Sequence, residues 1–440
     1  MSLFKKTEDR KRHKTVIIGL DGVPFTFLKK LIEKNKLPNI SSIIKKGRFN
    51  KMSVCLPEIS SVSWSSFMTG AQSGEHGIFG FVDLIPGSYK MYFPNFSNLK
   101  LNTIFDDLGE MSKRSIVINL PSTYPSRNIS GVLISGFVAP NLKKAVYPSN
   151  LFKELQKIKY SIDIDTKRSR SNTGFLFRSL DTTLKSRMAI GEFLWNREQW
   201  DLFLIVVTGT DRINHFLWNS GSDPSKKLHK DFIQYYQKVD KFVGTFFTKF
   251  MELPGSNIGK NHFMILSDHG FTGIESEIYI NKWLEENGFL SYINNHPSSW
   301  EDINPSSKAF AMDPSRIYIN KKDRFKNGSI GKKDVEKIKS EIASGLGELT
   351  YKNGSPVLRQ VFDREQLYHG PYKKFGPDLV LLSEYGFDLK GKIGSPYLFG
   401  RSNLQGMHTN DDAFIFSNRG NGVRTIFDVK NLILDEYHKT

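Results

Sequence analysis

Short apolar runs recur along the chain, and polar or amphipathic stretches separate them. Uninterrupted runs of this length are typical of strands that are buried on both faces of a parallel sheet. The runs are TVIIGL (15–20), SIVINL (115–120), GVLISGF (131–137), FLIVV (203–207), FMILS (263–267), LVLLS (379–383) and AFIFS (413–417). We therefore predict a mostly parallel central sheet.

Helical patterns alternate with these runs. One amphipathic stretch at 24–35 follows the first run, a long one at about 180–200 precedes the run at 203–207, and another covers 332–346. Strands that alternate with helices predict a layered α/β domain, in which helices flank the sheet. Residues 274–375 mix helical segments with loops rich in Pro, Gly and Asn. We expect them to form a smaller insertion that caps a site.

Size and charge limit the possible functions. The 440 residues are 39% hydrophobic and carry a formal net charge of +17, enough for one large domain at 15–440 behind a basic tail at 1–14. The positive charge favours an anionic partner, and a small phosphate-containing substrate, a polysaccharide, a nucleic acid and a lipid headgroup all fit this description. A protein that binds nucleic acid or another anionic polymer without catalysis remains an alternative, although no nucleic-acid-binding motif is present.

The single cysteine, Cys55, cannot form an internal disulfide bond, and no apolar run approaches the ~20 residues of a membrane span. The basic N-terminus lacks the apolar stretch of a signal peptide. We expect a cytoplasmic protein without a transmembrane segment.

Acidic and histidine side chains gather where several of the predicted strands end. In open α/β sheets, ligands bind outside the carboxyl ends of the strands. An Asp at such a place is often only a turn or helix-capping residue, but an Asp-His pair before a glycine is harder to explain as a cap. The candidate residues are Asp21, Asp211, His215, Asp268, His269 and His408.

This set of carboxylates and imidazoles suits Zn²⁺, and Mn²⁺ is the second possibility. Six ligands are too many for one tetrahedral site, so we predict two divalent metal ions in one cleft. The remaining histidines in polar or terminal stretches, His13 and His262 among them, are expected to be exposed to solvent.

A serine-rich segment lies between the first and second apolar runs. Ser60 and Ser61 follow a predicted strand, and a helix is expected to begin near Ser63. A hydroxyl at a helix N-terminus lies where backbone N–H groups favour a phosphate. An ordinary helix-capping serine is the alternative.

The order of the motifs IIGLDG, SSVSW, FMTG, HGIF, TDRINH, LSDHGF and GMH resembles that of the alkaline phosphatase superfamily, and most closely its type I phosphodiesterase/nucleotide pyrophosphatase branch. The resemblance extends from Asp21 to His408 and implies an alkaline-phosphatase-like α/β sandwich. It also implies a two-metal phosphohydrolase that forms a phosphoserine intermediate on a phosphate ester or nucleotide-like substrate. A cofactor-independent phosphomutase of the same superfamily is the nearer alternative. A sulfatase is not supported, because Ile59 stands where its C-x-P-x-R motif needs arginine.

The resemblance also assigns roles to residues. It implies one metal held by Asp211, His215 and His408, and a second held by Asp21, Asp268, His269 and the nucleophile. The nucleophile falls on Ser60, with Ser61 as the alternative. Ser63 stands where the family commonly has an asparagine that binds the phosphoryl oxygen, and Asn119 is a second candidate substrate-binding residue.

Overall fold

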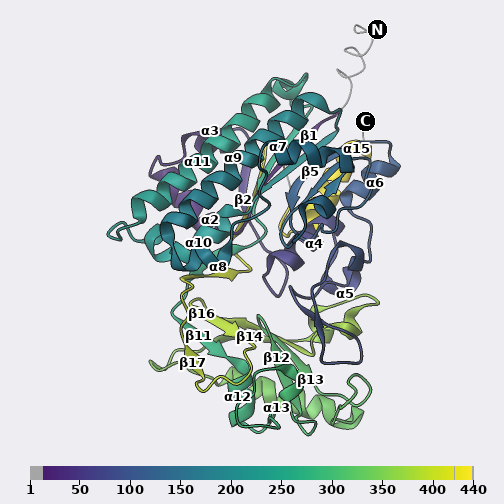
Figure 1. Ribbon diagram of the computed structural model, residues 1–440, viewed down its shortest axis with the longest axis vertical. Coiled ribbons are helices and arrows are strands. Elements are labelled where there is room, and N and C mark those ends of the chain that lie inside the picture. Colours follow the sequence, from purple (N-terminus) through teal and green to yellow (C-terminus); the bar gives the residue numbers. More distant parts are fainter. Residues whose placement is uncertain (1–12, 421, 439–440) are drawn as a thin grey trace.

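The computed structural model describes residues 13–420 and 422–438, so almost all of the predicted basic tail at 1–14 lies outside the described residues. The chain folds into a larger lobe, built on one sheet of eight strands, and a smaller lobe at one end of it (Figure 1). In order across the large sheet, the strands are β2 (Arg48–Met52), β19 (Ala413–Ser417), β9 (His262–Leu266), β1 (Thr15–Leu20), β8 (Leu202–Val207), β5 (Ser115–Leu120), β6 (Gly131–Ser135) and β7 (Val146–Tyr147).

The centre of this sheet is parallel. Strands β9, β1, β8, β5 and β6 run in one direction, and β2, β19 and β7 pair antiparallel at the two edges. Every residue of β1 and of β8 is buried. Such full burial explains why these strands are uninterrupted apolar runs, and it confirms the predicted mostly parallel α/β sheet.

Helices cover both faces of the sheet and use alternate residues of each strand. Ile18 and Ile205 belong to the core on one face, whereas their neighbours Ile17 and Leu204 belong to the core on the other, as the two-residue period of a strand requires. The first face is covered by α2 (Phe25–Glu33), α3 (Pro38–Ile44), α9 (Thr173–Arg197), α10 (Gly209–Ser222) and α11 (His229–Met251), and the second by α4 (Ser60–Thr69), α6 (Ile104–Glu110) and α15 (Asp428–His438).

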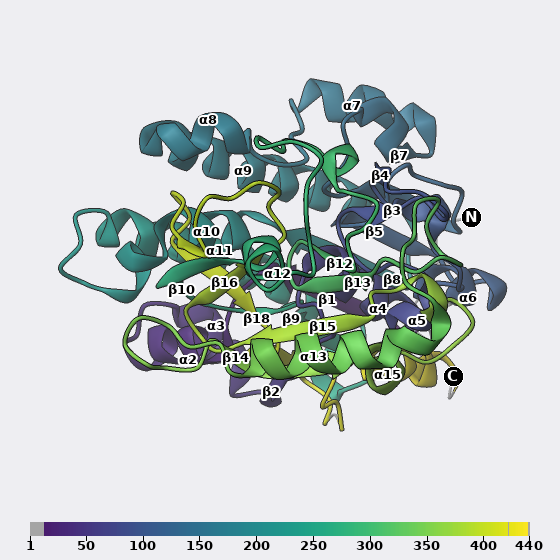
Figure 2. The ribbon, with the colours of Figure 1, turned by 90° about the horizontal axis from the view of Figure 1, so that it is seen from below.

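The smaller lobe, residues 276–400, has its own core and its own sheets (Figure 2). Trp283, Phe310, Ile317 and Ile342 are all buried in that core. The lobe contains an antiparallel sheet of β12 (Ala309–Met312), β13 (Arg316–Ile319), β15 (Leu379–Ser383) and β14 (Leu358–Asp363), a second sheet of β16 (Phe387–Lys390), β11 (Ser276–Tyr279) and β17 (Phe399–Gly400), and the helices α12 (Ile280–Glu286) and α13 (Val335–Gly347).

Two expectations from the sequence are wrong in detail. The run LVLLS at 379–383 forms β15 of the smaller lobe and not a strand of the large sheet. Its residues are still buried on both faces, Leu381 in the core of that lobe and Val380 in a cluster with Phe79 and Tyr368. An apolar run therefore reports burial but not which sheet provides it.

His13 and His262, expected at the surface, are both buried. His262 opens β9, which lies between β1 and β19, and its Nε2 is 2.7 Å from Ser417 Oγ. Strand neighbours that are distant in sequence bury this ring, so its local sequence could not reveal it. Among the described residues, no helix is both long and apolar enough to cross a membrane.

Candidate metal centre and substrate pocket

Three strands of the large sheet deliver polar side chains to the same edge. Asp21 directly follows β1, Asp211 lies in the first turn of α10 after β8, and Asp268 and His269 follow β9. Because β9, β1 and β8 are parallel neighbours, their carboxyl ends lie side by side. This arrangement brings together residues almost 250 positions apart in sequence.

A short pair of strands brings the last histidine to this edge. His408 lies on β18 (Gly406–Thr409), which pairs antiparallel with β10 (Gly270–Gly273), and it stands opposite Phe271. The rings of His408 and His269 consequently stack with their centroids 3.7 Å apart.

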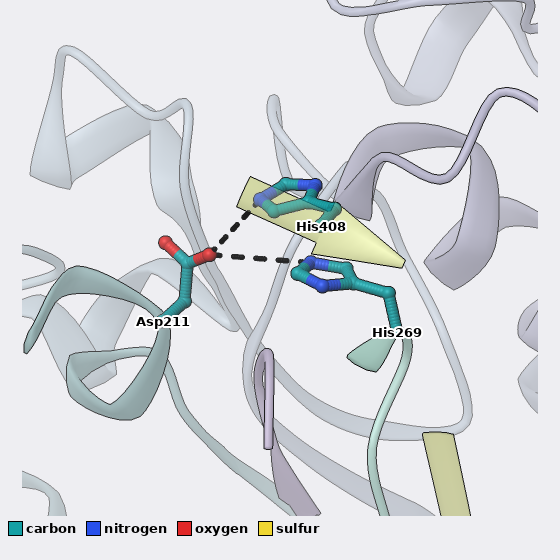
Figure 3. A group of neighbouring side chains, drawn as sticks. All are labelled: Asp211, His269 and His408. Carbon is teal, nitrogen blue, oxygen red and sulfur yellow. Dashed lines mark ion pairs between the residues drawn. The ribbon is translucent and has the colours of Figure 1, made fainter. Parts of the chain in front are cut away.

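The first ligand group consists of Asp211, His269 and His408 (Figure 3). Oδ1 of Asp211 is 3.3 Å from Nε2 of His408 and 4.0 Å from Nε2 of His269. His215, one helical turn after Asp211, is adjacent, because its Nε2 is 3.3 Å from the same Oδ1 and 2.9 Å from His408 Nε2.

The second ligand group consists of Asp21, Asp268 and His269. His269 Nε2 is 3.4 Å from Asp268 Oδ2 and 3.7 Å from Asp21 Oδ1. Ser60, the first residue of α4, also faces this group, with its Oγ 3.1 Å from His269 Nε2 and 3.3 Å from Asp21 Oδ1.

Each carboxylate has one oxygen held by a donor of the protein. Asp21 Oδ2 accepts from Trp64 Nε1 at 3.3 Å, Asp268 Oδ1 accepts from the backbone N–H of Gly22 at 3.0 Å, and Asp211 Oδ2 accepts from Arg212 at 2.6 Å. Gly22 has a φ of +65°, a conformation that glycine adopts without strain. The other oxygen of each carboxylate is thereby left to face the two groups.

Each imidazole is oriented in the same way by the main chain. The Nδ1–H of His215 donates to Gly406 O at 2.9 Å, that of His269 to Gly270 O at 3.0 Å, and that of His408 to Glu58 O at 2.7 Å. A carbonyl can only accept, so these bonds place the proton on Nδ1 and leave a lone pair on each Nε2. All three lone pairs point into the cluster.

Burial and crowding shift the pKa values here. Burial, together with the neighbouring Asp268 and Asp211 carboxylates, holds the pKa of Asp21 well above its usual range. Burial and Asp211 raise the pKa of Asp268 to about 7. Although burial opposes it, the pKa of Asp211 lies well below its usual range because of His215 and Arg212.

The donor set fits divalent cations. Oδ1 of Asp211 and Oδ2 of Asp268 are buried and have no hydrogen-bond partner among the described residues, although an orphaned buried carboxylate oxygen is costly. The potential ligand atoms of each group lie within 4.8 Å of one another. Mixed imidazole nitrogens and carboxylate oxygens are ligands that zinc accepts. Cations at these positions would satisfy the orphaned oxygens and the three Nε2 lone pairs together.

The serines of α4 differ in what they face. Ser60 Oγ contacts both Asp21 and His269, whereas the buried Ser61 Oγ has no partner in the part of the chain that the structure describes. The hydroxyl of Ser63 is 3.1 Å from the sulfur of Cys55 and is fully buried. The helix also begins at Ser60 and not near Ser63.

Asn119 lies at the end of β5 with a positive φ of 62°. Its side chain is buried, where Nδ2 donates to Val206 O and Oδ1 accepts from Tyr160. Neither Ser63 nor Asn119 lines the cavity described next.

A cavity of about 780 Å³ opens beside His215 and His408 and extends along the smaller lobe. Glu58, two residues before Ser60, also lines it, and burial raises the pKa of this carboxyl to about 7. Sequence reasoning missed both Glu58 and Arg212. The only signal in the sequence was that Glu58 lies close to Ser60 and that Arg212 is next to Asp211. Their other contacts, Asp163 for Arg212 and His408 for the Glu58 carbonyl, come from distant segments.

The amino-acid sequence matches one known protein family over most of its length. The sequence matches the family described as type I phosphodiesterase / nucleotide pyrophosphatase over residues 15–411. A sequence search of curated proteins found no match.

The fold is similar to several solved structures of low sequence identity. Phosphonoacetate hydrolase from Sinorhizobium meliloti 1021, in complex with phosphonoacetate, gives a TM-score of 0.65 at 15% identity, over 97% of this chain and 96% of that one. An inactive variant of murine ectonucleotide pyrophosphatase / phosphodiesterase 5, in complex with AMP, gives a TM-score of 0.59 at 12% sequence identity, over 97% of this chain and 95% of that one. The alkaline phosphatase PafA gives a TM-score of 0.57 at 12% sequence identity, over 97% of this chain and 96% of that one. These likenesses show an alkaline-phosphatase-like fold.

Proposed function

The chain belongs to the type I phosphodiesterase / nucleotide pyrophosphatase family and is a phosphoester hydrolase, and we propose that it works through Ser60, a phosphoserine intermediate and two divalent metal ions. Family membership favours this enzyme over the non-enzymatic binder of anionic polymers. The observation that carries the proposal is the position of the Ser60 hydroxyl between Asp21 and His269.

We assign each candidate ligand to one of the two ions from the lone pairs that its side chain has free and from its distances to the other ligands. His269 belongs to both geometric groups, but its Nδ1 donates to Gly270 O and only its Nε2 is free to ligate. It therefore serves one ion. We assign it to the ion with Asp21, Asp268 and Ser60, because its Nε2 lies 3.4 Å from Asp268 Oδ2 and 3.7 Å from Asp21 Oδ1 but 4.0 Å from Asp211 Oδ1. His215 completes the other set, with Asp211 and His408. The ions are Zn²⁺, with Mn²⁺ as the alternative; when bound, they lower the pKa of the Ser60 hydroxyl and neutralise charge on the phosphate.

The reaction we propose has two displacements. Ser60 Oγ loses its proton to solvent and attacks phosphorus, and the new P–O bond forms as the bond to the leaving oxygen breaks; the organic group takes up a proton from solvent and departs as an alcohol. Water then attacks the phosphorus of the phosphoserine, the bond to Ser60 Oγ breaks, the phosphate leaves, and Ser60 Oγ takes up a proton. The first N–H groups of α4 lie beside Ser60 and can donate to the phosphoryl oxygens. We propose that the smaller lobe acts as the cap of this site.

The test compares Ser60→Ala with Ser61→Ala. Both proteins, loaded with zinc, are assayed on a panel of chromogenic phosphomonoesters and phosphodiesters with and without chelator. We expect Ser60→Ala to lose about 10³-fold or more in kcat/KM, and Ser61→Ala to stay within about threefold of wild type. Mass spectrometry of acid-quenched wild type is expected to find phosphate on the peptide that contains Ser60. Retained activity in Ser60→Ala, or phosphate on Ser61, would refute the assignment.

Quenched reactions also separate hydrolase from mutase. A hydrolase releases inorganic phosphate in step with the alcohol, whereas a phosphomutase returns the phosphate to the product. We expect one equivalent of phosphate per alcohol from a monoester.

A further inference from the structure

The cavity beside the candidate metal centre has mainly apolar walls. Met312 and Met407 line it and are buried, and Met91 lines it and is exposed. Phe81, Trp300 and Ile393 also line the cavity and are partly exposed. Apolar side chains that remain accessible inside a cavity are a surface that an apolar ligand can cover. Most of these walls come from the smaller lobe and from the segment 81–91, which precedes α6, whereas His215 and His408 form the end at the metal centre.

Most charges on the walls are already matched by another charge or an amide. Lys390 Nζ lies 2.6 Å from Asp388, and Arg316 lies 2.6 Å from Asp83. Asp313 accepts a hydrogen bond from the N–H of Gly391. The lining contains three acidic and three basic residues, so it has no excess of positive charge to attract a second phosphate or a carboxylate: Glu58, Asp313, Asp388, Arg316, Lys390 and Lys392.

Glu58 is different. Its Oε2 is buried and has no hydrogen-bond partner among the described residues, although the side chain lines the cavity. Its own carbonyl accepts from Nδ1 of His408 at 2.7 Å, and Ser60 follows two positions later. The main chain of Glu58 is thus fixed next to the reacting centre, and its carboxylate has an oxygen without a partner at the wall of the cavity.

We propose that this cavity selects a phosphate ester whose organic group is a large, mainly apolar body with a hydrogen-bond donor, a hydroxyl or an amine, and that Glu58 accepts from this donor while Trp300 contacts the body. The proposal deepens the proposed function and rests on it. A cavity of about 780 Å³ is within the range that holds drug-sized groups, so a small alkyl ester would leave its walls uncovered.

The test is calorimetric binding of phosphonates, because their measured Kd does not depend on turnover or on leaving-group reactivity. The zinc-loaded protein is titrated with methylphosphonate and with 1-naphthylmethylphosphonate. We expect the naphthyl compound to bind at least about tenfold more tightly, since it buries apolar surface on the walls. Trp300→Ala should reduce this ratio to about threefold or less while leaving the Kd of methylphosphonate unchanged. Tyr397→Ala, an aromatic truncation in the same lobe at a residue that is 70% exposed and outside the cavity, is the matched control and should preserve the ratio.

A second series addresses Glu58. Benzylphosphonates with an aminomethyl, hydroxymethyl or ethyl substituent at each ring position are compared, and at least one amine or alcohol is expected to bind about tenfold more tightly than its ethyl counterpart. Glu58→Met should abolish that preference, whereas Glu58→Gln, which retains an acceptor, should keep it for the alcohol. Glu286→Gln, at an exposed position of α12, is the control. Zinc content is measured in every variant. It should not change, because the main-chain carbonyl that orients His408 is retained in these substitutions.

The outcomes distinguish this proposal from the proposed function. Equal Kd values for the methyl and naphthyl compounds, or no donor preference, in a protein whose esterase activity depends on Ser60, would overturn the substrate class alone. No zinc-dependent binding of any phosphonate would overturn both.

Discussion

The two lobes use their buried strands for different purposes. In the larger lobe, parallel strands end at a common edge, and the candidate metal ligands follow them: Asp21 after β1 and Asp268 after β9. In the four-stranded sheet of the smaller lobe, neighbouring strands run antiparallel, so their carboxyl ends do not meet at one edge. That lobe contributes no residue to the two ligand groups, but it contributes much of the cavity wall. Parallel topology concentrates reactive side chains, while the attached lobe provides a surface that can vary independently.

The largest expected effect is on the metal centre. Asp268→Asn replaces a fully buried carboxylate at the end of β9 and removes one negative charge from a ligand group. We expect a loss of about 10³-fold in kcat/KM and a clear loss of bound zinc, measured by elemental analysis after dialysis. Asp302→Asn in the smaller lobe is the control, and it should retain both. Full zinc content in Asp268→Asn would contradict the assignment of the ligand.

A matched pair of core truncations compares the two lobes directly. Ile205 in β8 and Ile342 in α13 are both fully buried, and we expect Ile→Ala at either position to cost about 2–5 kcal/mol in the free energy of unfolding. Only Ile205→Ala should also weaken zinc binding, because β8 positions Asp211. Denaturant unfolding and competition with a chelator measure the two quantities. Equal zinc affinities in the two variants would show that the strand does not set the ligand geometry.

The pH dependence of stability is a smaller effect over any single pH unit. Burial lowers the pKa of His262 to about 3, so below its ordinary value near 6.5 the unfolded chain binds a proton that the folded chain does not. Stability therefore falls as the pH decreases from about 6.5 towards 3, by about 1.4 kcal/mol per pH unit for this group. In metal-free protein, His262→Asn should reduce that slope relative to wild type, measured by urea unfolding at several pH values. The exposed His296 of the smaller lobe offers the control substitution, with an unchanged slope.

The smallest effect is expected at two surface lysines. Lys373 pairs with Glu365 at 2.6 Å, and neither Lys373 nor Lys374 lines the cavity. The double charge reversal to Glu should therefore change KM by less than about twofold at physiological salt. A large increase in KM that disappears at high salt would instead show that these lysines attract the substrate.

The central strands of the large sheet could be predicted, because a strand that is buried on both faces appears in the sequence as an unbroken run of apolar residues. The run TVIIGL became β1 with the expected bounds, whereas LVLLS became a strand of another sheet, since a run does not specify its partners. Likewise, Asp21, Asp211 and Asp268 are recognisable because they follow strands. Arg212 and Glu58 are not, because what they contact is decided by chain segments far away, such as Asp163 for Arg212.

The main-chain carbonyls that receive the Nδ1 protons of His215, His269 and His408 have an evolutionary and practical consequence. A side-chain acceptor can be lost by a single base change, but an amide oxygen is supplied by every amino acid. The orientation of these imidazole rings therefore depends on the path of the backbone and not on the identity of the residue that supplies the carbonyl. If Glu58 has the role proposed above, a substitution of its side chain would change which ligands bind, while its carbonyl would still accept from His408 Nδ1.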